Sequence, residues 1–553
     1  MSDSRRRSYP RLTRRAILSG AAVTATAFVL PEGPAFTATA TTNGKAVAVP
    51  APAAAASPFT RAAVLDAARK LAKAPFAAPP TDLPGTLKNL SYEEYRDIQF
   101  RNTAEIWGDS DVPFRLQMFH RGFYFKEDIE IAIVNDDKAE HLAYSPNYYR
   151  FGERVPRPLP TEDIGFAGIR LIGRINGQGN SNNPQDFGEV AVFQGASYFR
   201  SIGRNQIYGL SARGLAVKTA EPEGEEFPLF RQYWIEKPDH GAESIVVHAL
   251  LDSQSVTGAY RFTIRPGTQT TMDVEVTLFP RTDLKKFGIG PASSMYMFGP
   301  NGRNGVDDYR PEVHDSDGLL MVNGKGERLW RPLSNPKTLQ ISAFQDTRPR
   351  GFGLSQRERS FAAYQDIEAN YERRPTLWVE PVGDWGDGAV TLIEIPSDSE
   401  INDNIVAYWA PKDPIKAGTE YSLAYRLLWG TGSVPERTTA RIVGTRLGRA
   451  HIKDPTPLRF WVIDYVMSDP AVTAALQQAK IANPSTPRPL PQAMVTSSSG
   501  KTDLVSVVEN PETGGWRLTF RLDPGDAKMI ELRAVLAFKD GTPAETWVYR
   551  WTA

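Results

Sequence analysis

The sequence contains no cysteine among its 553 residues. This absence excludes disulfide bonds, thiolate nucleophiles and cysteine-ligated metal centres. An exported protein of this composition has to draw its stability from a large hydrophobic core. The chain also lacks an excess of either charge, since 64 Lys and Arg residues balance 64 Asp and Glu residues. That balance argues against nucleic acid and against anionic membrane surfaces as partners.

Motifs of several common chemistries are also missing. There is no GxxxxGK[ST] phosphate loop, no HExxH zinc motif and no GxSxG nucleophile elbow. Residues 209–214 (GLSARG) lack the spacing of a serine elbow and are interpreted as a turn between strands. The six histidines are scattered and form no close pair with metal-ligand spacing. We therefore expect neither a metal nor a cofactor.

The amino terminus has the form of an export signal. A head containing six arginines precedes an uncharged segment over residues 16–30, which is too short to span a bilayer as a mature helix. The pair Arg14 and Arg15 indicates a twin-arginine signal, which is read as an address. The basic head of a Sec signal would give a similar pattern.

We assign residues 1–40 to this signal and residues 41–56, rich in Ala and Pro, to a flexible linker. No other segment of the sequence is long and apolar enough to span a membrane. The mature protein is therefore expected in the periplasm, without stable insertion into a membrane.

The remaining sequence predicts a mostly β protein. Ser57 and Pro58 resemble an N-cap and first residue of one helix, with Val64 and Ala68 on its apolar face. Beyond it apolar residues recur with a period of two, as strands of half-buried antiparallel sheets require, over residues 114–118, 129–133, 272–278 and 421–427.

Composition changes near residues 430–437, and short strands follow at 458–466, 516–522, 529–538 and 546–551, with a hairpin turn at 511–515. We predict a large antiparallel β-sandwich over residues 57–432 and a smaller immunoglobulin-like β-sandwich over residues 438–553.

Acidic and aromatic residues concentrate between positions 307 and 409. Carboxylates supply acid and base, and flat rings supply stacking faces for sugars, so the composition is that of a glycoside-cleaving cleft. Each acid also has a simpler interpretation, because Asp and Gly favour turns. This applies to the HDSDG segment with Asp315, to the GDWGDG segment with Asp384 and Asp387, and to Asp403 in NDNIVAYW. A desolvated carboxyl at Asp403 could instead keep its proton near neutral pH.

Several long segments resemble the periplasmic osmoregulated glucan biosynthesis proteins, the OpgG/OpgD (MdoG/MdoD) family. The resemblance extends from about Phe59 to the carboxyl end. The segments that carry it are FAGIRL (166–171), GASYFR (195–200), YGLSARGLA (208–216), LLDSQSVTGAYRF (250–262), RPEVHDSDGLL (310–320), WRPLSNP (330–336), YERRPTLWVEP (371–381) and NDNIVAYW (402–409). The twin-arginine signal is closer to the D branch of this family.

The resemblance implies the same two-sandwich architecture and a β-1,2-glucan substrate. It implies an inverting endo-β-1,2-glucanase, a glycoside hydrolase with Asp403 as general acid and Asp315 as general base. It also places Tyr371 in the cleft. Two positions depart from the family pattern, with Ala363 where His is common and Gln194 where Leu is common.

Four aromatic residues are candidate substrate-binding faces: Tyr364, Tyr371, Trp378 and Trp385. Trp378 lies in an apolar run and could equally be a core residue. A non-catalytic protein that binds and shapes nascent glucan would suit the same sandwiches and aromatic residues. A homodimer and contact with the glucan synthesis machinery remain open from the sequence.

Overall fold

The structure is a computed structural model. It describes residues 56–177, 183–303, 305–432, 440–450, 457–482 and 490–553. The assigned signal and nearly all of the linker, which end at residue 56, lie outside these residues. Among the described residues no helix has the length and apolar character needed to cross a membrane.

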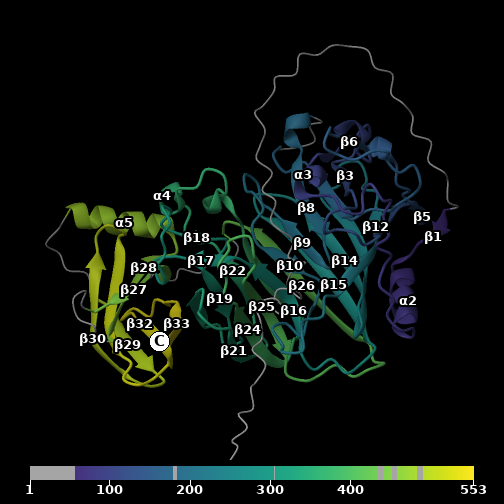
Figure 1. Ribbon diagram of the computed structural model, residues 1–553. Coiled ribbons are helices and arrows are strands. Elements are labelled where there is room, and N and C mark those ends of the chain that lie inside the picture. Colours follow the sequence, from purple (N-terminus) through teal and green to yellow (C-terminus); the bar gives the residue numbers. More distant parts are fainter. Residues whose placement is uncertain (1–55, 178–182, 304, 433–439, 451–456, 483–489) are drawn as a thin grey trace, which may run out of the picture.

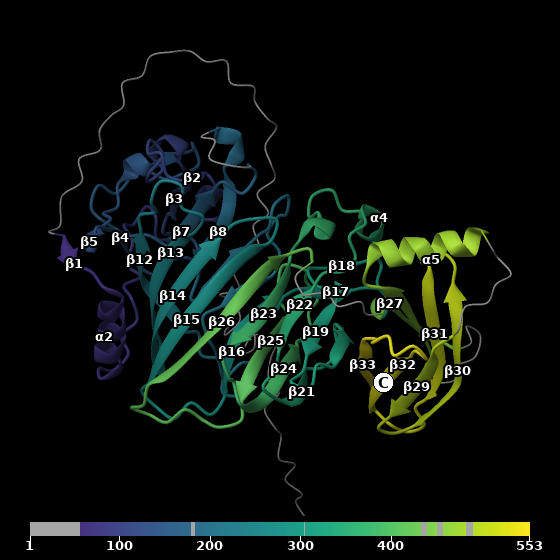
Figure 2. The ribbon, with the colours of Figure 1, turned by 180° about the vertical axis from the view of Figure 1, so that it is seen from behind.

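Two large sheets form the first part of the molecule (Figures 1 and 2). The first, of 15 strands in the described residues, runs in the order β1 (Ser57–Pro58), β5 (Lys138–His141), β4 (Glu130–Asn135), β12 (Leu229–Glu236), β13 (Ile245–Asp252), β14 (Val256–Arg265), β15 (Thr270–Pro280), β26 (Tyr421–Gly430), β23 (Thr376–Val382), β22 (Gly351–Ser355), β19 (Gly318–Val322), β20 (Arg328–Pro332), β33 (Thr546–Thr552), β32 (Met529–Ala537) and β29 (Gln492–Ser497).

The second large sheet, of 10 strands in the same residues, runs β21 (Gln340–Thr347), β24 (Asp387–Glu394), β25 (Ile405–Pro411), β16 (Phe287–Ser294), β10 (Ser211–Arg213), β9 (Tyr198–Ser201), β8 (Gly188–Gln194), β7 (Gly168–Gly173) and β3 (Phe114–Phe119), with β11 (Ala216–Val217) also on β16. Two small two-stranded sheets accompany it, β17 (Tyr296–Phe298) with β18 (Val313–His314), and β2 (Ile98–Phe100) with β6 (Tyr149–Phe151).

The main core lies between these two sheets. Phe193 of β8 meets Phe262 of β14 edge-on, with ring centroids 5.2 Å apart. Farther along, Trp385 packs between Trp409 of β25 and Tyr425 of β26, at 6.4 and 6.0 Å. Strands with alternating apolar residues bury one face, and here the buried faces of the two sheets pack against each other. The predicted large sandwich is therefore confirmed.

The second part of the chain builds a smaller sandwich at one end of the molecule (Figure 1). A four-stranded sheet of β27 (Ala440–Arg449), β28 (Arg459–Met467), β31 (Gly515–Asp523) and β30 (Lys501–Asn510) packs on β33 and β32. Trp461 of β28 contacts Trp547 of β33 at 5.1 Å, and Phe520 of β31 completes this core. The predicted hairpin at 511–515 is present between β30 and β31.

The boundary expected between the domains falls on residues 433–439, which lie outside the described residues; β26 ends before them and β27 begins after them. Both helices of more than five residues flank sheets: α2 (Arg61–Ala72) covers β13–β15, and α5 (Pro470–Ala482) lies against β28. The shorter helices in the described part are α3 (Tyr92–Arg96), α4 (Phe361–Tyr364) and the 3-10 turns η1 (Asn102–Ala104), η2 (Pro146–Tyr148), η3 (Pro184–Asp186) and η4 (Tyr371–Arg373).

The predicted start of α2 is wrong by three residues. Ser57 and Pro58 pair with β5 as a short strand, and Thr60 is the N-cap, accepting a hydrogen bond from the Ala63 N–H at 3.3 Å. The Ser-Pro dipeptide mimics a helix start, but edge pairing with β5 uses its backbone instead. The predicted apolar face is confirmed by the burial of Val64 and Ala68.

Candidate active site

Two loops bring Asp315 and Asp403 next to one short stretch of the chain, residues 294–296, where β16 passes into β17. Asp315, which follows β18, donates its backbone N–H to the carbonyl oxygen of Met295 at 2.8 Å. Asn404, the neighbour of Asp403, donates its N–H to the carbonyl oxygen of Ser294 at 3.0 Å. The two acids indicated by the sequence are therefore anchored on adjacent peptide groups.

The loop that carries Asp403 is fixed at both ends. The Asn404 side chain accepts from the Tyr296 N–H at 2.8 Å and donates to the Tyr296 carbonyl oxygen at 2.9 Å. At the other end, Glu400 accepts hydrogen bonds from Arg310 at 2.9 Å and from the Tyr371 hydroxyl at 3.3 Å. These contacts limit where the Asp403 carboxyl can point.

Asp315 is a buried carboxylate with a buried cation. Its side chain accepts a short hydrogen bond from Nη1 of Arg374, and only 3 % and 6 % of the two side chains are exposed. Nε and Nη2 of Arg374 donate to the Ala369 carbonyl oxygen at 3.2 and 3.1 Å, and the guanidinium lies 4.2 Å above the Tyr371 ring. Burial alone would lower the pKa of Arg374, but Asp315, Tyr371 and Asp366 together outweigh it and the pKa is raised.

Asp403 has a different environment. Its Oδ2 is buried and makes no hydrogen bond among the described residues. Burial raises the pKa of Asp403; Arg200 opposes the shift and the negative charge of Asp315 adds to it. A carboxyl with a raised pKa holds its proton at higher pH than a solvated one, which is the property of a general acid.

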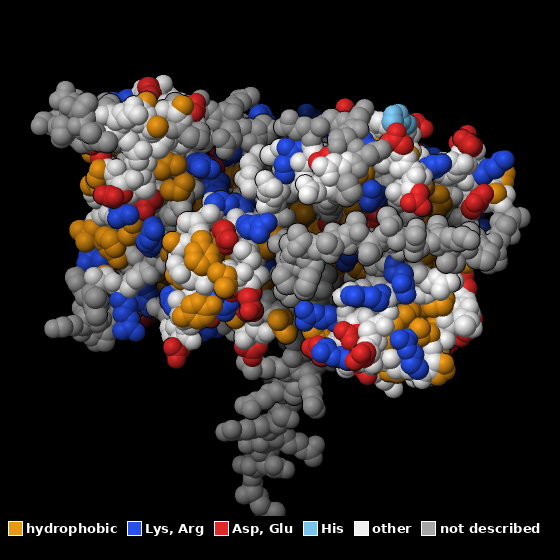
Figure 3. Space-filling view, turned by 90° about the horizontal axis from the view of Figure 1, so that it is seen from above, with side chains coloured by type: hydrophobic (Ala, Val, Ile, Leu, Met, Phe, Trp, Pro, Cys, Tyr) orange, Lys and Arg blue, Asp and Glu red, His pale blue; other side chains and the backbone are white. Residues whose placement is uncertain are grey.

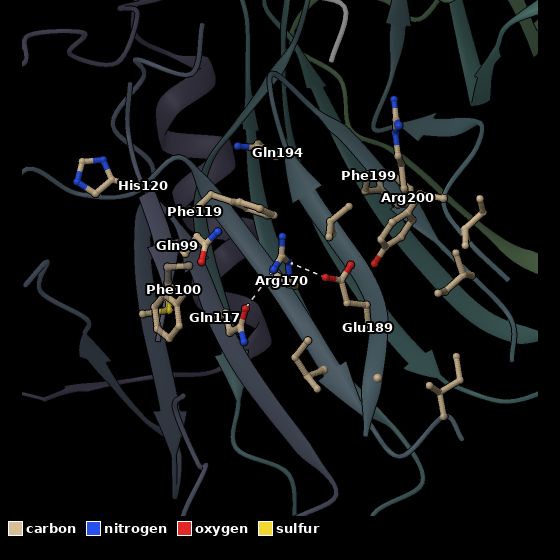
Figure 4. Close-up of a pocket in the computed structure, with 18 of the residues that line it drawn as sticks. Gln99, Phe100, Gln117, Phe119, His120, Arg170, Glu189, Gln194, Phe199 and Arg200 are labelled. Atoms are coloured by element: carbon tan, nitrogen blue, oxygen red, sulfur yellow. Dashed lines mark hydrogen bonds and ion pairs between the residues drawn. The ribbon is translucent and has the colours of Figure 1, made fainter. Parts of the chain in front are cut away.

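A cavity of about 900 Å³ lies near Asp403, although neither acid is among the residues that line it. Tyr198 and Arg200 of β9 line it, and both interact electrostatically with Asp403. Figure 4 shows part of its wall, where Arg170 lies between Gln117 and Glu189, at 3.3 Å from each. Polar groups on the face of a sheet, next to an acid, form a pocket suited to a hydroxyl-rich ligand.

The four candidate aromatic residues divide into two pairs. Tyr371 and Tyr364 lie beside Asp315, in a small cluster with Met295, and both are buried. Trp378 and Trp385 are only 2 % and 8 % exposed and belong to the cores of the smaller and larger sandwich. At this burial none of the four rings offers an open stacking face to a sugar, and the two indoles also lie away from the acids, in the cores.

Both departures from the family pattern lie at this site. Ala363 packs against the cluster of Tyr364 and Tyr371. Gln194 lines the cavity, where its Nε2 donates to the Tyr95 hydroxyl at 3.2 Å. They can therefore alter ligand contacts without removing either acid.

One group in the described part of the chain has the geometry of a metal site. The ligand atoms of Glu312, His314 and Asp317, here named the His314 cluster, lie within 4.8 Å of one another. His314 Nε2 already meets Glu312 at 2.8 Å. Burial would lower the pKa of His314, but Glu312 and Asp317 outweigh it and the pKa is raised. A metal ion would have to replace the contact between His314 and Glu312, since it binds neutral imidazole.

Comparison with known proteins decides the family. The model of the family described as "Periplasmic glucan biosynthesis protein, MdoG" matches residues 59–551. The chain belongs to this family. Membership implies participation in glucan biosynthesis and a periplasmic location.

Its relatives are similar over most of their length. A glucans biosynthesis protein G of Vibrio cholerae is 53% identical over 494 residues, covering 89% of this chain and 87% of the relative. A protein G of Shewanella sp. is 54% identical over 489 residues, covering 88% and 86%. Among solved structures, a galactose mutarotase related enzyme of Lactobacillus acidophilus aligns at 9% identity with a TM-score of 0.20, covering 44% of this chain and 98% of its own.

The sequence did not indicate the residues that surround the acids. Arg374 and Arg200 appear as ordinary arginines in the YERRP and GASYFR segments, yet both act electrostatically on Asp403, and Arg374 also binds Asp315. Asn404 was visible only as a turn residue. The position of the acidic pair depends on contacts between distant segments, which no local pattern encodes.

Proposed function

We propose that this chain is an endo-acting, inverting β-1,2-glucanase that cleaves the backbone of osmoregulated periplasmic glucans. The observation that carries the proposal is the unequal environment of two neighbouring carboxyls, whose loops are anchored on residues 294–296. Asp403 has a raised pKa and an unpartnered oxygen, whereas Asp315 is bound to Arg374. Two carboxyls in different environments are how glycosidases separate acid from base.

In this mechanism the raised pKa lets Asp403 donate its proton to the departing glycosidic oxygen. Asp315, its charge compensated by Arg374, accepts the proton of the attacking water. Direct inversion uses carboxyls about 6.5–9.5 Å apart, with the water between them. Because Asp315 is only 2 % exposed, we favour transfer through intervening hydroxyls or waters over direct contact.

The nearby cavity would hold the glucan. Its wall includes the buried Gln206 Nε2, which makes no hydrogen bond among the described residues, and the buried Tyr208 hydroxyl, which lies near Glu189. Buried polar groups of this kind cost free energy unless they find a partner. A sugar, with many hydroxyls, could supply partners after a small movement of these side chains. Tyr371 and Tyr364 would shape the site next to Asp315.

The test is hydrolysis of linear β-1,2-glucan by the purified mature protein, with β-1,3- and β-1,4-glucans as controls. We expect shorter β-1,2-oligosaccharides whose new reducing ends are first α-configured in a proton NMR time course. Products with β-configured ends would refute inversion. No cleavage of any glucan would refute the enzyme.

A second candidate is a glucan-binding protein that guides or shapes nascent chains without cleaving them. It is favoured by the burial of Asp315 and its pairing with Arg374, since structural ion pairs also look like this. Binding of β-1,2-glucan without any turnover by the wild-type protein would select this function.

We further propose export by the twin-arginine route and, on that signal alone, a place in the D branch, although the relatives described above carry the G name. A homodimer and contact with the glucan synthesis machinery are compatible with this role. The upper face in Figure 3 mixes basic and acidic side chains, as the zero net charge suggests.

A further inference from the structure

The smaller sandwich is hydrogen-bonded into the large one. Strand β33 pairs in parallel with β20, so that Leu329 faces Thr546 and Trp330 faces Trp547. Both ribbon views place α4 and β18, which flank the acid-bearing loops, between the two sandwiches (Figures 1 and 2). The candidate active site therefore lies close to the junction of the domains.

A buried ion pair crosses this junction. Glu545, next to β33 and 1 % exposed, accepts hydrogen bonds from Nη1 and Nη2 of Arg357, both at 2.8 Å. It also accepts from the Ile442 N–H at 2.9 Å. The Arg357 guanidinium lies 3.6 Å from the centre of the Trp330 ring. A bidentate pair with a stacked guanidinium fixes position as well as charge.

Arg357 belongs to a segment that holds the loop of Asp315. We name residues 356–359 the bracket. The N–H groups of Arg357 and Glu358 both donate to Oδ2 of Asp317, the latter at 2.9 Å. Gln356 Nε2 donates to the His314 carbonyl oxygen at 2.9 Å. The residues on both sides of Asp315 are thus tied to the bracket.

The same bracket holds the segment of Arg374. Gln356 Nε2 also donates to the Tyr371 carbonyl oxygen at 3.2 Å. Arg359 Nη1 donates to the carbonyl oxygens of Glu372, at 3.0 Å, and of Arg374. The bracket therefore fixes the backbone of both partners of the Asp315–Arg374 pair.

We infer that Glu545 of the smaller sandwich is a positioning residue for the Asp315–Arg374 pair, acting through Arg357 and the bracket. The smaller domain is then part of the frame of the active site and not an independent appendage. The expected effect on the rate rests on the proposed glucanase activity. The expected effect on the position of the loop that carries Asp315 does not depend on that activity.

The experiment compares Glu545→Gln with Glu327→Gln. The first replaces one carboxylate oxygen, which accepts N–H groups, with an amide NH2 group, which cannot accept them. The second is a control at the same junction, because Glu327 binds Arg533 at 2.5 Å and the Thr546 hydroxyl at 2.8 Å but makes no hydrogen bond or ion pair with the bracket in the described part of the chain. Both are measured in the full mature protein by kinetics on linear β-1,2-glucan and by hydrogen exchange of peptides covering residues 312–317.

For Glu545→Gln we expect kcat to fall about 10- to 100-fold with KM changed less than about 2-fold, because displacement of a catalytic group by about 1 Å has effects of this size. Amides of residues 312–317 should exchange about 10-fold faster. Glu327→Gln should change neither. Glu545→Asp, which keeps the charge, should recover part of the rate, and replaces Glu545→Gln if that variant does not fold.

Equal effects of Glu545→Gln and Glu327→Gln on rate and exchange would overturn the inference, as would a wild-type rate and wild-type exchange in Glu545→Gln. If the wild-type protein cleaves no glucan, the proposed function fails separately. The exchange of residues 312–317 then decides the positioning role by the same criteria.

Discussion

Replacing Asp403 by Asn should abolish most glucan cleavage and leave the protein at least as stable as the wild type. Asn keeps the shape of the side chain but has no proton to transfer. General acid help is worth roughly 10²–10⁴-fold, and a sugar alkoxide is a poor leaving group. We therefore expect kcat to fall by about 10³-fold or more, which corresponds to about 4 kcal/mol of transition-state stabilisation.

The effect on stability follows from the sign of the pKa shift. Burial raises the pKa of Asp403 above its ordinary value of 3.8, so the folded protein binds this proton more tightly than the unfolded chain does. The resulting stability is fully present below the unfolded pKa and is lost as the pH rises through the folded pKa. Each unit of elevation corresponds to about 1.4 kcal/mol. Asn cannot ionise, so the Asp403→Asn variant does not lose this stability as the pH rises.

The assay is a pair of measurements on each variant. The first is the urea midpoint of unfolding, followed by tryptophan fluorescence. For Asp403→Asn this midpoint should equal that of the wild type at about pH 4 and exceed it at about pH 7.5. The pH–rate profile of the wild type should be bell-shaped, with the alkaline limb set by Asp403. Asp387→Asn is the control, because Asp387 is exposed at the start of β24, where it accepts a hydrogen bond from the Thr347 hydroxyl of β21 at 2.7 Å; its rate should stay within about 2-fold of wild type.

Two results would refute the reasoning. A wild-type rate in Asp403→Asn would mean that this carboxyl transfers no proton. A lower urea midpoint at pH 7.5 would mean that the ionised carboxylate has stabilising partners in the folded protein, contrary to the unpartnered Oδ2.

Three further predictions follow. Asp315→Asn should reduce cleavage by orders of magnitude and, unlike Asp403→Asn, lower stability by about 3–5 kcal/mol because it leaves the buried Arg374 charge unpaired; a urea midpoint equal to wild type would contradict this. EDTA should leave the rate unchanged, and a loss restored by Zn²⁺ or Ca²⁺ would make the His314 cluster a metal site. Replacing Arg14 and Arg15 by Lys should retain the precursor in the cytoplasm by cell fractionation, and normal export would exclude the twin-arginine route.

Local patterns predicted the elements of the fold better than their assembly. The alternation in residues 272–278 and 421–427 indicated β15 and β26, which pair with each other over nine residue pairs. The helical face of Val64 and Ala68 was found, although its N-cap was misplaced onto Ser57. The parallel pairing of β20 with β33 was not predicted, because it joins Leu329 to Thr546 and no periodicity encodes a contact at that separation.

The candidate site was predicted in part for the same reason. Acid-rich, glycine-rich segments indicated Asp315 and Asp403, but a turn and a catalytic carboxyl have the same local sequence. Aromatic content suggested Trp378 and Trp385 as stacking faces, yet apolar neighbours draw both into cores. What separates these cases is burial and pairing, which depend on the whole fold.

The contrast between the two acids argues that their environments were not selected for stability alone. A protein that needed only a turn at Asp403 would gain by exposing the carboxyl or giving Oδ2 a partner, since an unpaired buried polar group costs about 1–3 kcal/mol. Instead, Asp403 is held by the anchored neighbour Asn404 in a place where Asp315 disfavours its ionisation. Arg374 meanwhile gives Asp315 the partner that Asp403 lacks. A local loss of folding free energy of this kind is common at functional sites, where the rest of the fold offsets it.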